Sequence, residues 1–537
     1  MKFGGFIIKN SKNIILALPI ILMMIQSSAY SQVYSQSGGT AALTNQSYSS
    51  VTADESAVKV TNSGVFTLTN STITKSGTTS SDDNSSFYGQ NAGILATTAS
   101  TINLEDCTVN TTGRGANGVF AYGAGTTVNM KRLTITCTEQ GGHAIMATGG
   151  GVMAAEDVDM TTSGTNSGAI ATDRGSGTIT VTGGTVITTG QDSPGIYSTG
   201  LITVSDATIS ASGSESAVIE GANSIVLNNT SITSSKANKW GVLIYQSMSG
   251  DAEGTDGTFT MTGGSLSNTA ATGPLFYVTN STGIITLNNA EISTASDTLI
   301  QAGSNKWGTS GKNGGHIVLS ANEETISGSI VMDSYSSFSG TLNSTTYTGA
   351  INNSNTASSA SLTMDGNSTW TLTGNSYLDV FSDVDGISGT SVANVNGNGY
   401  NVYYDASLSG NSSLGGLTYS LVNGGYLLPE GSTSVGEAES SVITDYALAQ
   451  NYPNPFNPTT NISFSLPRNG FVTLKIYNSI GEEVATLVNN QLDAGKYSYT
   501  WNAAALASGV YIYRVIVTGN NGGKQAFSQA KKLILSK

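Results

Sequence analysis

The sequence predicts an all-β protein: a right-handed, single-stranded parallel β-helix over residues 32–428, followed by a small immunoglobulin-like β-sandwich. Three observations indicate this fold class. A six-residue phrase returns about every 25 residues, which is the spacing of a solenoid repeat. Charged residues make up only 10% of the 537 residues, too few for an ordinary helical globule. Short runs of Val, Ile and Leu argue against disorder, because disordered segments lack such residues.

The repeated phrase predicts a bend between two strands. An apolar residue is followed two positions later by Asn, Asp or Gly, and three positions after that by another apolar residue. Asn, Asp and Gly tolerate the left-handed backbone of a tight bend. Only the copy with Arg132 breaks this rule. The copies are Leu68–Ile73, Leu104–Val109, Met130–Ile135, Ala155–Met160, Val181–Val186, Val204–Ile209, Leu227–Ile232, Met261–Leu266 and Leu287–Ile292.

Between the copies lies a second repeated element, a small residue followed by apolar ones, as in Gly93-Ile94 and Gly118-Val119. Each period therefore holds about three short strands, and we expect about 12 to 15 coils in a rod of about 60–70 Å at roughly 4.8 Å per coil. Residues 76–90, 246–257 and 302–315 interrupt the period. We expect them to be protruding loops, which in solenoids commonly carry binding functions.

Cys107 and Cys137 are the only cysteines. Aligning Val109 with Ile135 puts Cys137 about four residues further along its strand than Cys107, roughly 13 Å at the rise of a strand. That separation is too long for a disulfide. The sequence therefore predicts two unpaired core residues.

Two loops contain the candidate ligand-binding residues. Asn238-Lys-Trp240-Gly is echoed by Asn305-Lys-Trp307-Gly, and at a coil edge Trp240 and Trp307 could stack on a sugar or a protein partner. The alternative is that each ring lies on the neighbouring coil. Asp251, Glu253 and Asp256 could offer oxygen ligands to calcium, although the EF-hand spacing is absent and a solvated acidic loop is the competing interpretation. We expect these loops near the same edge of successive coils and, calcium apart, no cofactor.

No motif fixes a catalytic constellation, so we expect that the protein is not an enzyme. The alternative is a polysaccharide-degrading lyase or glycosidase of the pectin-lyase-like fold, since secreted β-helices often have such activities. Lyases of that kind need a basic residue beside clustered carboxylates, and no acidic cluster lies at a matching coil position. A glycosidase needs two carboxyl groups roughly 5–10 Å apart, which no spacing here specifies.

The ends of the chain predict export. Residues 1–31 read as a secretory signal peptide, because lysines precede a short apolar run and small residues lie near position 30. No other stretch could cross a bilayer as a helix, so we expect no transmembrane span in the mature chain. Residues 32–450 carry 10 basic and 32 acidic side chains, but residues 451–537 carry 8 and 3, which supports a boundary near 450. The acidic rod makes nucleic acid an improbable partner.

Two resemblances extend this interpretation. Residues 362–377 alternate apolar and polar side chains and bend at glycines. This style resembles the closing coils of autotransporter passenger domains, and the resemblance covers residues 355–428. The β-helical region as a whole resembles autotransporter and pectin-lyase-like surface proteins. We expect the helix to end near Leu428 and residues 429–449 to form a linker.

Residues 450–537 closely resemble the type A C-terminal sorting domain of the type IX secretion system. The motif residues are Asn451, Pro453, Pro455, Gly509, Tyr511, Lys531 and Lys532. The resemblance implies export across the outer membrane by the type IX machinery, removal of the domain, and then anchoring or release at the surface. We therefore expect a structural or adhesin-like rod whose partners are surface glycans or host and matrix proteins. The ligand itself stays open.

Overall fold

The computed structural model describes residues 32–383, 385–431, 445–518 and 525–537. The chain divides into two compact units, residues 1–431 and 432–537. The predicted signal peptide lies outside the described residues, as does most of the predicted linker. Residues 447–448, assigned to that linker from the sequence, instead form a strand that pairs with the second unit.

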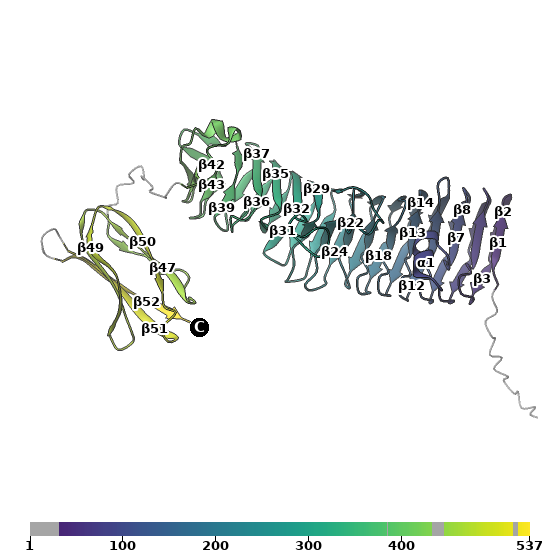
Figure 1. Ribbon diagram of the computed structural model, residues 1–537, viewed down its shortest axis with the longest axis horizontal. Helices are drawn as coiled ribbons and strands as arrows, with labels where there is room; N and C mark the ends of the chain where they lie inside the picture. Colours follow the sequence, from purple (N-terminus) through teal and green to yellow (C-terminus); the bar gives the residue numbers. More distant parts are fainter. Residues whose placement is uncertain (1–31, 384, 432–444, 519–524) are drawn as a thin grey trace, which may run out of the picture. The chain divides into compact units, whose positions relative to one another are not determined.

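The first unit is a parallel β-solenoid, as predicted, in which three strands alternate around each coil (Figure 1). The predicted right-handedness stays a prediction. Each of the three long sheets collects one strand from each of the successive coils that it spans, and neighbouring strands pair in parallel. We name these sheets 1, 2 and 3. Three short strands per period were predicted, and the strand order confirms them.

Sheet 1 has 12 strands. They are β1 (Tyr34–Ser37), β4 (Val58–Thr61), β7 (Ile94–Thr97), β10 (Val119–Tyr122), β13 (Ile145–Thr148), β16 (Ile170–Thr172), β19 (Ile196–Ser198), β22 (Ala217–Glu220), β25 (Val242–Tyr245), β28 (Phe276–Thr279), β31 (Thr298–Ala302) and β34 (Ser329–Met332).

Sheet 2 has 14 strands and sheet 3 has 10. Sheet 2 consists of β2 (Thr40–Thr44), β5 (Val65–Thr69), β8 (Thr101–Glu105), β11 (Thr127–Lys131), β14 (Gly151–Glu156), β17 (Gly177–Thr182), β20 (Leu201–Ser205), β23 (Ser224–Asn228), β26 (Asp256–Thr262), β29 (Ser281–Asn288), β32 (Gly315–Asn322), β35 (Ser337–Asn343), β37 (Ser359–Met364) and β40 (Val380–Ser382). Sheet 3 consists of β3 (Ser47–Ser50), β6 (Thr72–Lys75), β9 (Thr108–Thr111), β12 (Thr134–Cys137), β15 (Asp159–Thr162), β18 (Thr185–Thr188), β21 (Thr208–Ala211), β24 (Ser231–Ser234), β27 (Ser265–Asn268) and β30 (Glu291–Thr294).

The bends lie where the phrase predicts them. The central residue of every copy has a positive φ, including Arg132 at 54°. The strands on either side therefore stay in register from coil to coil, and the final apolar residues of the copies stack inside the rod, as Ile73 on Val109 and Val109 on Ile135. All three are fully buried. The side chain of Arg132 forms ion pairs with Glu105 and Asp106. These pairs give it partners at a bend position that otherwise favours Asn, Asp or Gly.

The cysteine prediction is confirmed. Cys107 and Cys137 are buried and free. The register pairs Val109 with Ile135 and Thr111 with Cys137, so Cys107 lies in the preceding turn.

The rod closes differently from the regular coils. A fourth, nine-stranded sheet takes over from sheet 3, and within it β41 pairs with β42 and β44 with β45 in antiparallel fashion. This sheet contains β33 (Thr325–Ser327), β36 (Thr346–Thr348), β38 (Thr369–Thr371), β39 (Ser376–Leu378), β41 (Ile387–Ser388), β42 (Ser391–Asn396), β43 (Val402–Tyr404), β44 (Tyr419–Val422) and β45 (Tyr426–Pro429), and a 3-10 helix spans Ser409–Leu414. Its last strand ends one residue beyond the predicted Leu428.

The second unit consists of two antiparallel sheets around one apolar core. The immunoglobulin-like topology stays a prediction. One sheet contains β46 (Ala447–Leu448), β47 (Thr459–Leu466) and β50 (Gly495–Asn502), and the other contains β48 (Gly470–Tyr477), β49 (Glu483–Leu492), β51 (Gly509–Thr518) and β52 (Gln525–Leu535). In the described part of the chain, no helix has both the length and the apolar character needed to span a membrane.

Replacing Asn229 by Ala tests the bend rule. Asn229 has a φ of 46°, and an ordinary side chain in that left-handed region costs about 1–2 kcal/mol. We expect Asn229→Ala to lower the free energy of unfolding by about that amount in a urea titration, and Asn229→Gly to lower it less. The neighbouring Asn228→Ala, on the outer face of β23, is the matched control and should change it little. Equal midpoints for Asn229→Ala and Asn228→Ala would contradict the role assigned to the bend.

Candidate functional site

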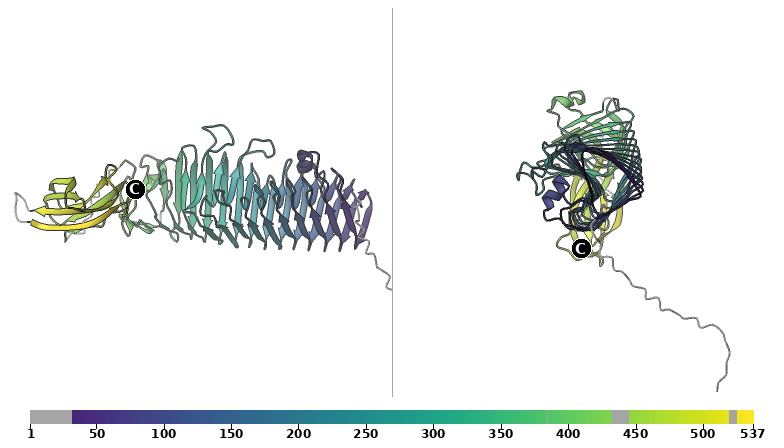
Figure 2. Two further views of the ribbon diagram at one scale, coloured as in Figure 1. Left: turned by 90° about the horizontal axis from the view of Figure 1, so that it is seen from below. Right: turned by 90° about the vertical axis from the view of Figure 1, so that its right-hand side faces the viewer.

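All three interruptions of the repeat flank sheet 1. The first precedes β7, and the other two follow β25 and β31 directly. In the left view of Figure 2, the short purple helix and two teal loops project from one side of the rod. The first interruption was predicted as a loop but contains helix α1 (Asp82–Tyr88). Ser81 caps its first turn by accepting a hydrogen bond from the Asn84 N–H, and Gly89 ends it at a φ of 68°.

The outer face of sheet 1 carries apolar side chains that these interruptions cover. Two clusters of outward-facing residues are buried: Leu95, Phe120, Met146 and Ala171 in one, and Val218, Leu243 and Tyr277 in the other. Tyr197 packs against both clusters. The α1 segment lies on the first cluster, because Thr148 Oγ1 donates to the Phe87 carbonyl at 2.7 Å.

Both candidate tryptophans belong to the second cluster. The Trp240 ring stacks on Tyr277, with centroids 4.4 Å apart and an interplanar angle of 8°. The Trp307 ring lies 4.6 Å from Tyr245 and 6.4 Å from Trp240. We call Trp240, Tyr245, Tyr277 and Trp307 the aromatic cluster. Both tryptophans remain partly exposed, so the structure combines the two alternatives: Trp240 lies on its neighbouring coil yet keeps part of its surface in solvent.

Lysines lie beside the aromatic cluster. Lys306 Nζ is 4.9 Å from the centre of the Trp307 ring, which is a cation–π distance. Lys239 Nζ pairs with Asp192 at 2.9 Å and with the buried Glu215 at 3.3 Å. Burial alone would lower the pKa of Lys239, but the charges of those two carboxylates hold it above its usual value. The ammonium group of Lys239 is therefore fixed in its charged form.

A carboxylate network fastens the loop after β25 to sheet 1. Glu220 is only 1% exposed, and its Oε2 accepts hydrogen bonds from the Tyr197 and Tyr245 hydroxyls at 2.5 and 2.7 Å. The Ser247 hydroxyl donates to its other oxygen. A buried carboxylate normally needs a cationic partner or several hydrogen bonds, and here three hydroxyl groups supply them.

Arg174 joins α1 to the same loop. Its guanidinium lies 4.0 Å over the Phe87 ring, and its Nη2 pairs with Asp251 Oδ1 at 2.7 Å. The adjacent Asp173 lies near the carboxylates of Asp251 and Glu220. Burial raises the pKa of Asp173 to about 7, and the charges of Asp251 and Glu220 add to that rise against the opposing hydrogen bond from the Arg174 N–H.

The three acidic residues of the predicted calcium loop do not converge. Asp251 is paired with Arg174, the Glu253 carbonyl accepts from the Ala222 N–H, and Asp256 begins β26. Within the described residues, no group of three or more His, Cys, Asp or Glu side chains is arranged to hold a metal ion. Calcium at this loop therefore rests on composition alone.

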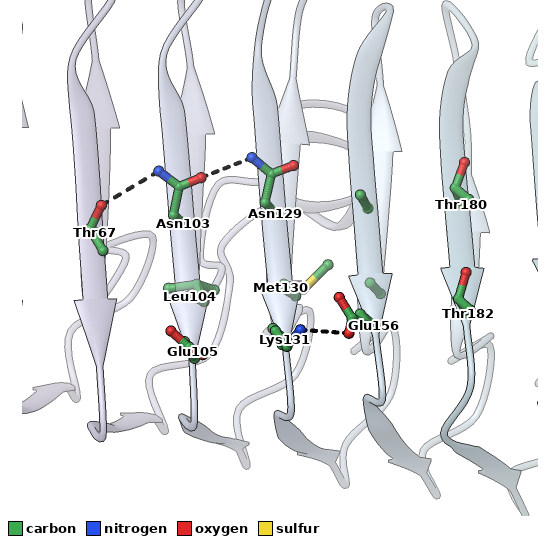
Figure 3. A pocket seen from close by; sticks show the side chains of 12 residues that line it. Thr67, Asn103, Leu104, Glu105, Asn129, Met130, Lys131, Glu156, Thr180 and Thr182 are labelled. Carbon is green, nitrogen blue, oxygen red and sulfur yellow. Dashed lines mark hydrogen bonds and ion pairs between the residues drawn. The ribbon is translucent and has the colours of Figure 1, made fainter.

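A groove on sheet 2 of about 530 Å³ carries no comparable chemistry (Figure 3). Asn129 Nδ2 donates to Asn103 Oδ1 at 2.8 Å, and Lys131 pairs with Glu156 at 2.6 Å. The polar side chains of the groove thus bind one another, and Figure 3 shows them in rows across neighbouring strands.

Sequence reasoning missed Asp173, Arg174, Tyr197, Glu220 and Tyr245. Tyr197 lies in the middle of β19, and the other four lie at or just beyond the ends of sheet 1 strands, where the coil register brings them together. One signal was available in the sequence. At the outward position of the second repeated element, some copies have an aromatic or acidic residue in place of the usual small or aliphatic one.

Asp173→Asn tests the electrostatics of this network. The pKa of Asp173 is about 7 in the folded protein and about 3.9 in the unfolded chain. Its carboxyl therefore contributes stability that is fully present below about pH 3.9 and is lost as the pH rises through about 7. We expect Asp173→Asn to match the parent protein near pH 4 and to be more stable at pH 8, in thermal unfolding across that range. The exposed Asp256→Asn serves as control. A stability difference that stays constant from pH 4 to pH 8 would show that Asp173 keeps its ordinary acidity.

The sorting-motif residues form a separate arrangement in the second unit. The buried Asn451 donates its N–H to the Tyr513 hydroxyl at 2.9 Å and its side-chain Nδ2 to Thr460 Oγ1 at 2.9 Å. The peptide bonds before Pro453 and Pro455 are both cis. Between them, Asn454 Oδ1 accepts from the Ile534 N–H at 2.8 Å. The opening motif is thereby attached to the last strand of the chain.

The other motif residues lie on that last strand and on the strand beside it. Gly509 begins β51, and the Tyr511 hydroxyl donates to the Ala507 carbonyl at 2.8 Å. Lys531 and Lys532 lie on β52 opposite Tyr513 and Ile512, and the Lys532 carbonyl accepts from Gln450 Nε2 at 2.7 Å. The terminal strand is therefore part of the core sheet and not a free tail.

Comparison with known families agrees with this arrangement. Residues 450–535 match the family model of the secretion system C-terminal sorting domain. No curated protein matches the chain. A β-solenoid body is thus joined to a type IX sorting domain, and the protein is one that is secreted across the outer membrane to the cell surface or the extracellular space.

Proposed function

We propose that the protein is an exported structural or adhesive rod that binds a partner through the aromatic cluster on sheet 1. The observation that carries this proposal is the convergence of Trp240 and Trp307 on one outer face, with both rings partly exposed. Aromatic rings with one face in solvent suit stacking on a sugar or on a protein side chain. Surface glycans and host or matrix proteins are therefore the proposed partners, and the sorting domain engages the type IX machinery.

The surroundings of the cluster support a preformed surface. Loop 302–315 is tied down by Asn313, whose Nδ2 donates to the Asn305 and Trp307 carbonyls at 2.6 and 2.8 Å. Asn305 in turn donates to the Tyr277 hydroxyl at 3.1 Å. A surface held by such bonds loses little conformational entropy when a partner binds.

A polysaccharide-degrading enzyme is the second candidate, and one observation favours it. Extending the strand register places Asp173 and Glu220 at the same level of sheet 1, two strands apart, or about 9.6 Å at the spacing of sheet strands. Inverting glycosidases place their carboxyl groups about 6.5–9.5 Å apart. Glu220, however, is buried and already accepts hydrogen bonds from three hydroxyl groups, so neither water nor a sugar reaches its carboxylate oxygens. Because Glu220 is buried, we favour the structural or adhesive rod over the enzyme.

Binding should depend on the two tryptophans. We expect the purified protein to bind a subset of a glycan and matrix-protein array, and Trp240→Ala combined with Trp307→Ala to weaken that binding at least about tenfold, which equals about 1.4 kcal/mol. Tyr403→Ala, which removes one ring of the stacked Tyr377–Tyr403 pair elsewhere on the rod, is the matched control. Undiminished binding by the double variant would remove the site. Release of reducing ends or unsaturated uronates in a parallel assay would favour the enzyme.

Export should depend on the terminal strand. β52 pairs with β51 along its length and anchors the Asn454 segment, so deleting residues 531–537 removes part of the sorting domain's core. We expect this deletion to leave the protein in the periplasm of a host with the type IX system, as judged by fractionation and surface proteolysis. Lys537→Ala, at the end of the chain, is the control and should be exported. Surface display of the deletion variant at the parent level would contradict this expectation.

A further inference from the structure

A pair of buried oxygen atoms in the closing coils has no hydrogen-bond partner. Asp383 follows β40 and is 1% exposed, and Asn394 lies on β42. Asp383 Oδ2 and Asn394 Oδ1 are both inaccessible to solvent and both lack a donor. Buried acceptors without a partner are rare in proteins, so each one calls for a physical explanation.

The orientation of both groups is fixed by their other atoms. Asp383 Oδ1 accepts from the Gly386 N–H at 3.0 Å and from Asn394 Nδ2 at 3.2 Å. Asn394 Nδ2 also donates to the Ser368 carbonyl at 3.0 Å. Exchanging the oxygen and nitrogen of the Asn394 amide would place two carbonyl oxygens together, so its Oδ1 has to point away from Ser368.

The free oxygens converge beside Gly386. A Cβ atom on Gly386 would lie 2.1 Å from Asn394 Oδ1, 2.4 Å from Asp383 Oδ2 and 2.5 Å from Asp383 Oδ1. The two unpartnered oxygens are therefore within about 4.5 Å of each other, the sum of the first two distances. Only the absence of a side chain at Gly386 lets them approach so closely.

The local field favours a cation. The carboxylates of Asp385 and Asp365 are close enough to raise the pKa of Asp383, in addition to the larger effect of burial. Asp385 is exposed and lies against Gly366 of the neighbouring coil. An exposed carboxylate can turn toward these oxygens, whereas Asp365 already accepts hydrogen bonds from Ser344 and Ser368.

We propose that Asp383 and Asn394 form a calcium-binding site that fastens the closing coil of the rod. Calcium prefers oxygen ligands from carboxylates and amides, binds carboxylates through one or both oxygens, and accepts irregular geometry. Asp383 supplies its unpartnered Oδ2 and Asn394 its unpartnered Oδ1, and Asp385 with water completes the shell. Asp383 follows β40, the last strand of sheet 2, and Asn394 lies on β42, so the ion links the end of the regular coils to the antiparallel closure.

Calcium titration of the purified protein after treatment with EGTA tests this site. We expect calorimetry to detect binding with a dissociation constant of about 0.1–1 mM, the range of extracellular calcium modules. The melting temperature should rise with calcium concentration, because a ligand that binds only the folded state stabilises it. Magnesium at the same concentration should give a smaller rise, since it demands near-ideal octahedral geometry.

Two variants locate the effect. Asp383→Asn keeps the shape and the Gly386 hydrogen bond but removes the charge, and it should weaken calcium binding at least tenfold and abolish the calcium-dependent rise in melting temperature. Asp405→Asn is the matched control: Asp405 Oδ1 is occupied by the Ser407 N–H and hydroxyl, so calcium should act as in the parent. If Asp383→Asn does not fold, Asn394→Asp replaces it, and its added carboxylate should strengthen the calcium dependence.

The competing explanation is a shared proton, with Asp383 protonated and donating from Oδ2 to Asn394 Oδ1. In that case Asp383→Asn would be as stable as the parent or more stable at pH 7, and calcium would change the melting temperature of both proteins equally or not at all. Either result would overturn the calcium site. An identical calcium response in the parent and in Asp383→Asn would place any bound ion in another acidic loop and would also refute the proposal.

Discussion

The rod depends on one backbone constraint: from Asn45 to Ser344, successive coils bend at the same point through a residue with a left-handed conformation. That bend lets parallel strands of successive coils pair without slipping. Because a slip of one residue would exchange the inner and outer faces of a strand, the bend keeps the apolar ladders inside. It also creates ladders outside, so that residues far apart in sequence, such as Trp240 and Trp307, become neighbours on one face.

The outer faces of the three sheets differ in the polarity of their side chains and therefore in whether other segments have to cover them. The outward positions of sheets 2 and 3 are mostly Ser, Thr and Asn, as in β17 and β26, and need no cover. Sheet 1 instead presents Leu95, Phe120 and Leu243 outward, and these are buried beneath inserted segments. Insertions and apolar outer residues therefore occur together, because each makes the other stable. The partly exposed tryptophans lie at the margin of this covered region.

The sequence was sufficient for features that follow from local pattern. The bends and the three strands per coil depend on residues within one period, and the separation of Cys107 from Cys137 follows from aligning two copies of the phrase. The network of Asp173, Glu220 and Tyr245 was not predictable in that way, because its members meet only through the register of successive coils. Helix α1 was missed because seven residues give too short a periodic signal, although Ser81 and Gly89 were recognisable caps.

Charge placement links these observations. The rod has few ionisable groups, and burying a carboxylate costs free energy unless the carboxylate is fully hydrogen-bonded. Glu220 is nevertheless buried, and the three hydroxyl groups that bind it come from sheet 1 and from the inserted loop after β25. The desolvation of Glu220 is thus offset only when that loop is in place. The burial that makes Glu220 unsuitable as a catalyst therefore lets it stabilise the loop after β25. Its hydrogen bonds hold this loop, which carries Asp251, against the outer face of sheet 1, where the aromatic cluster lies.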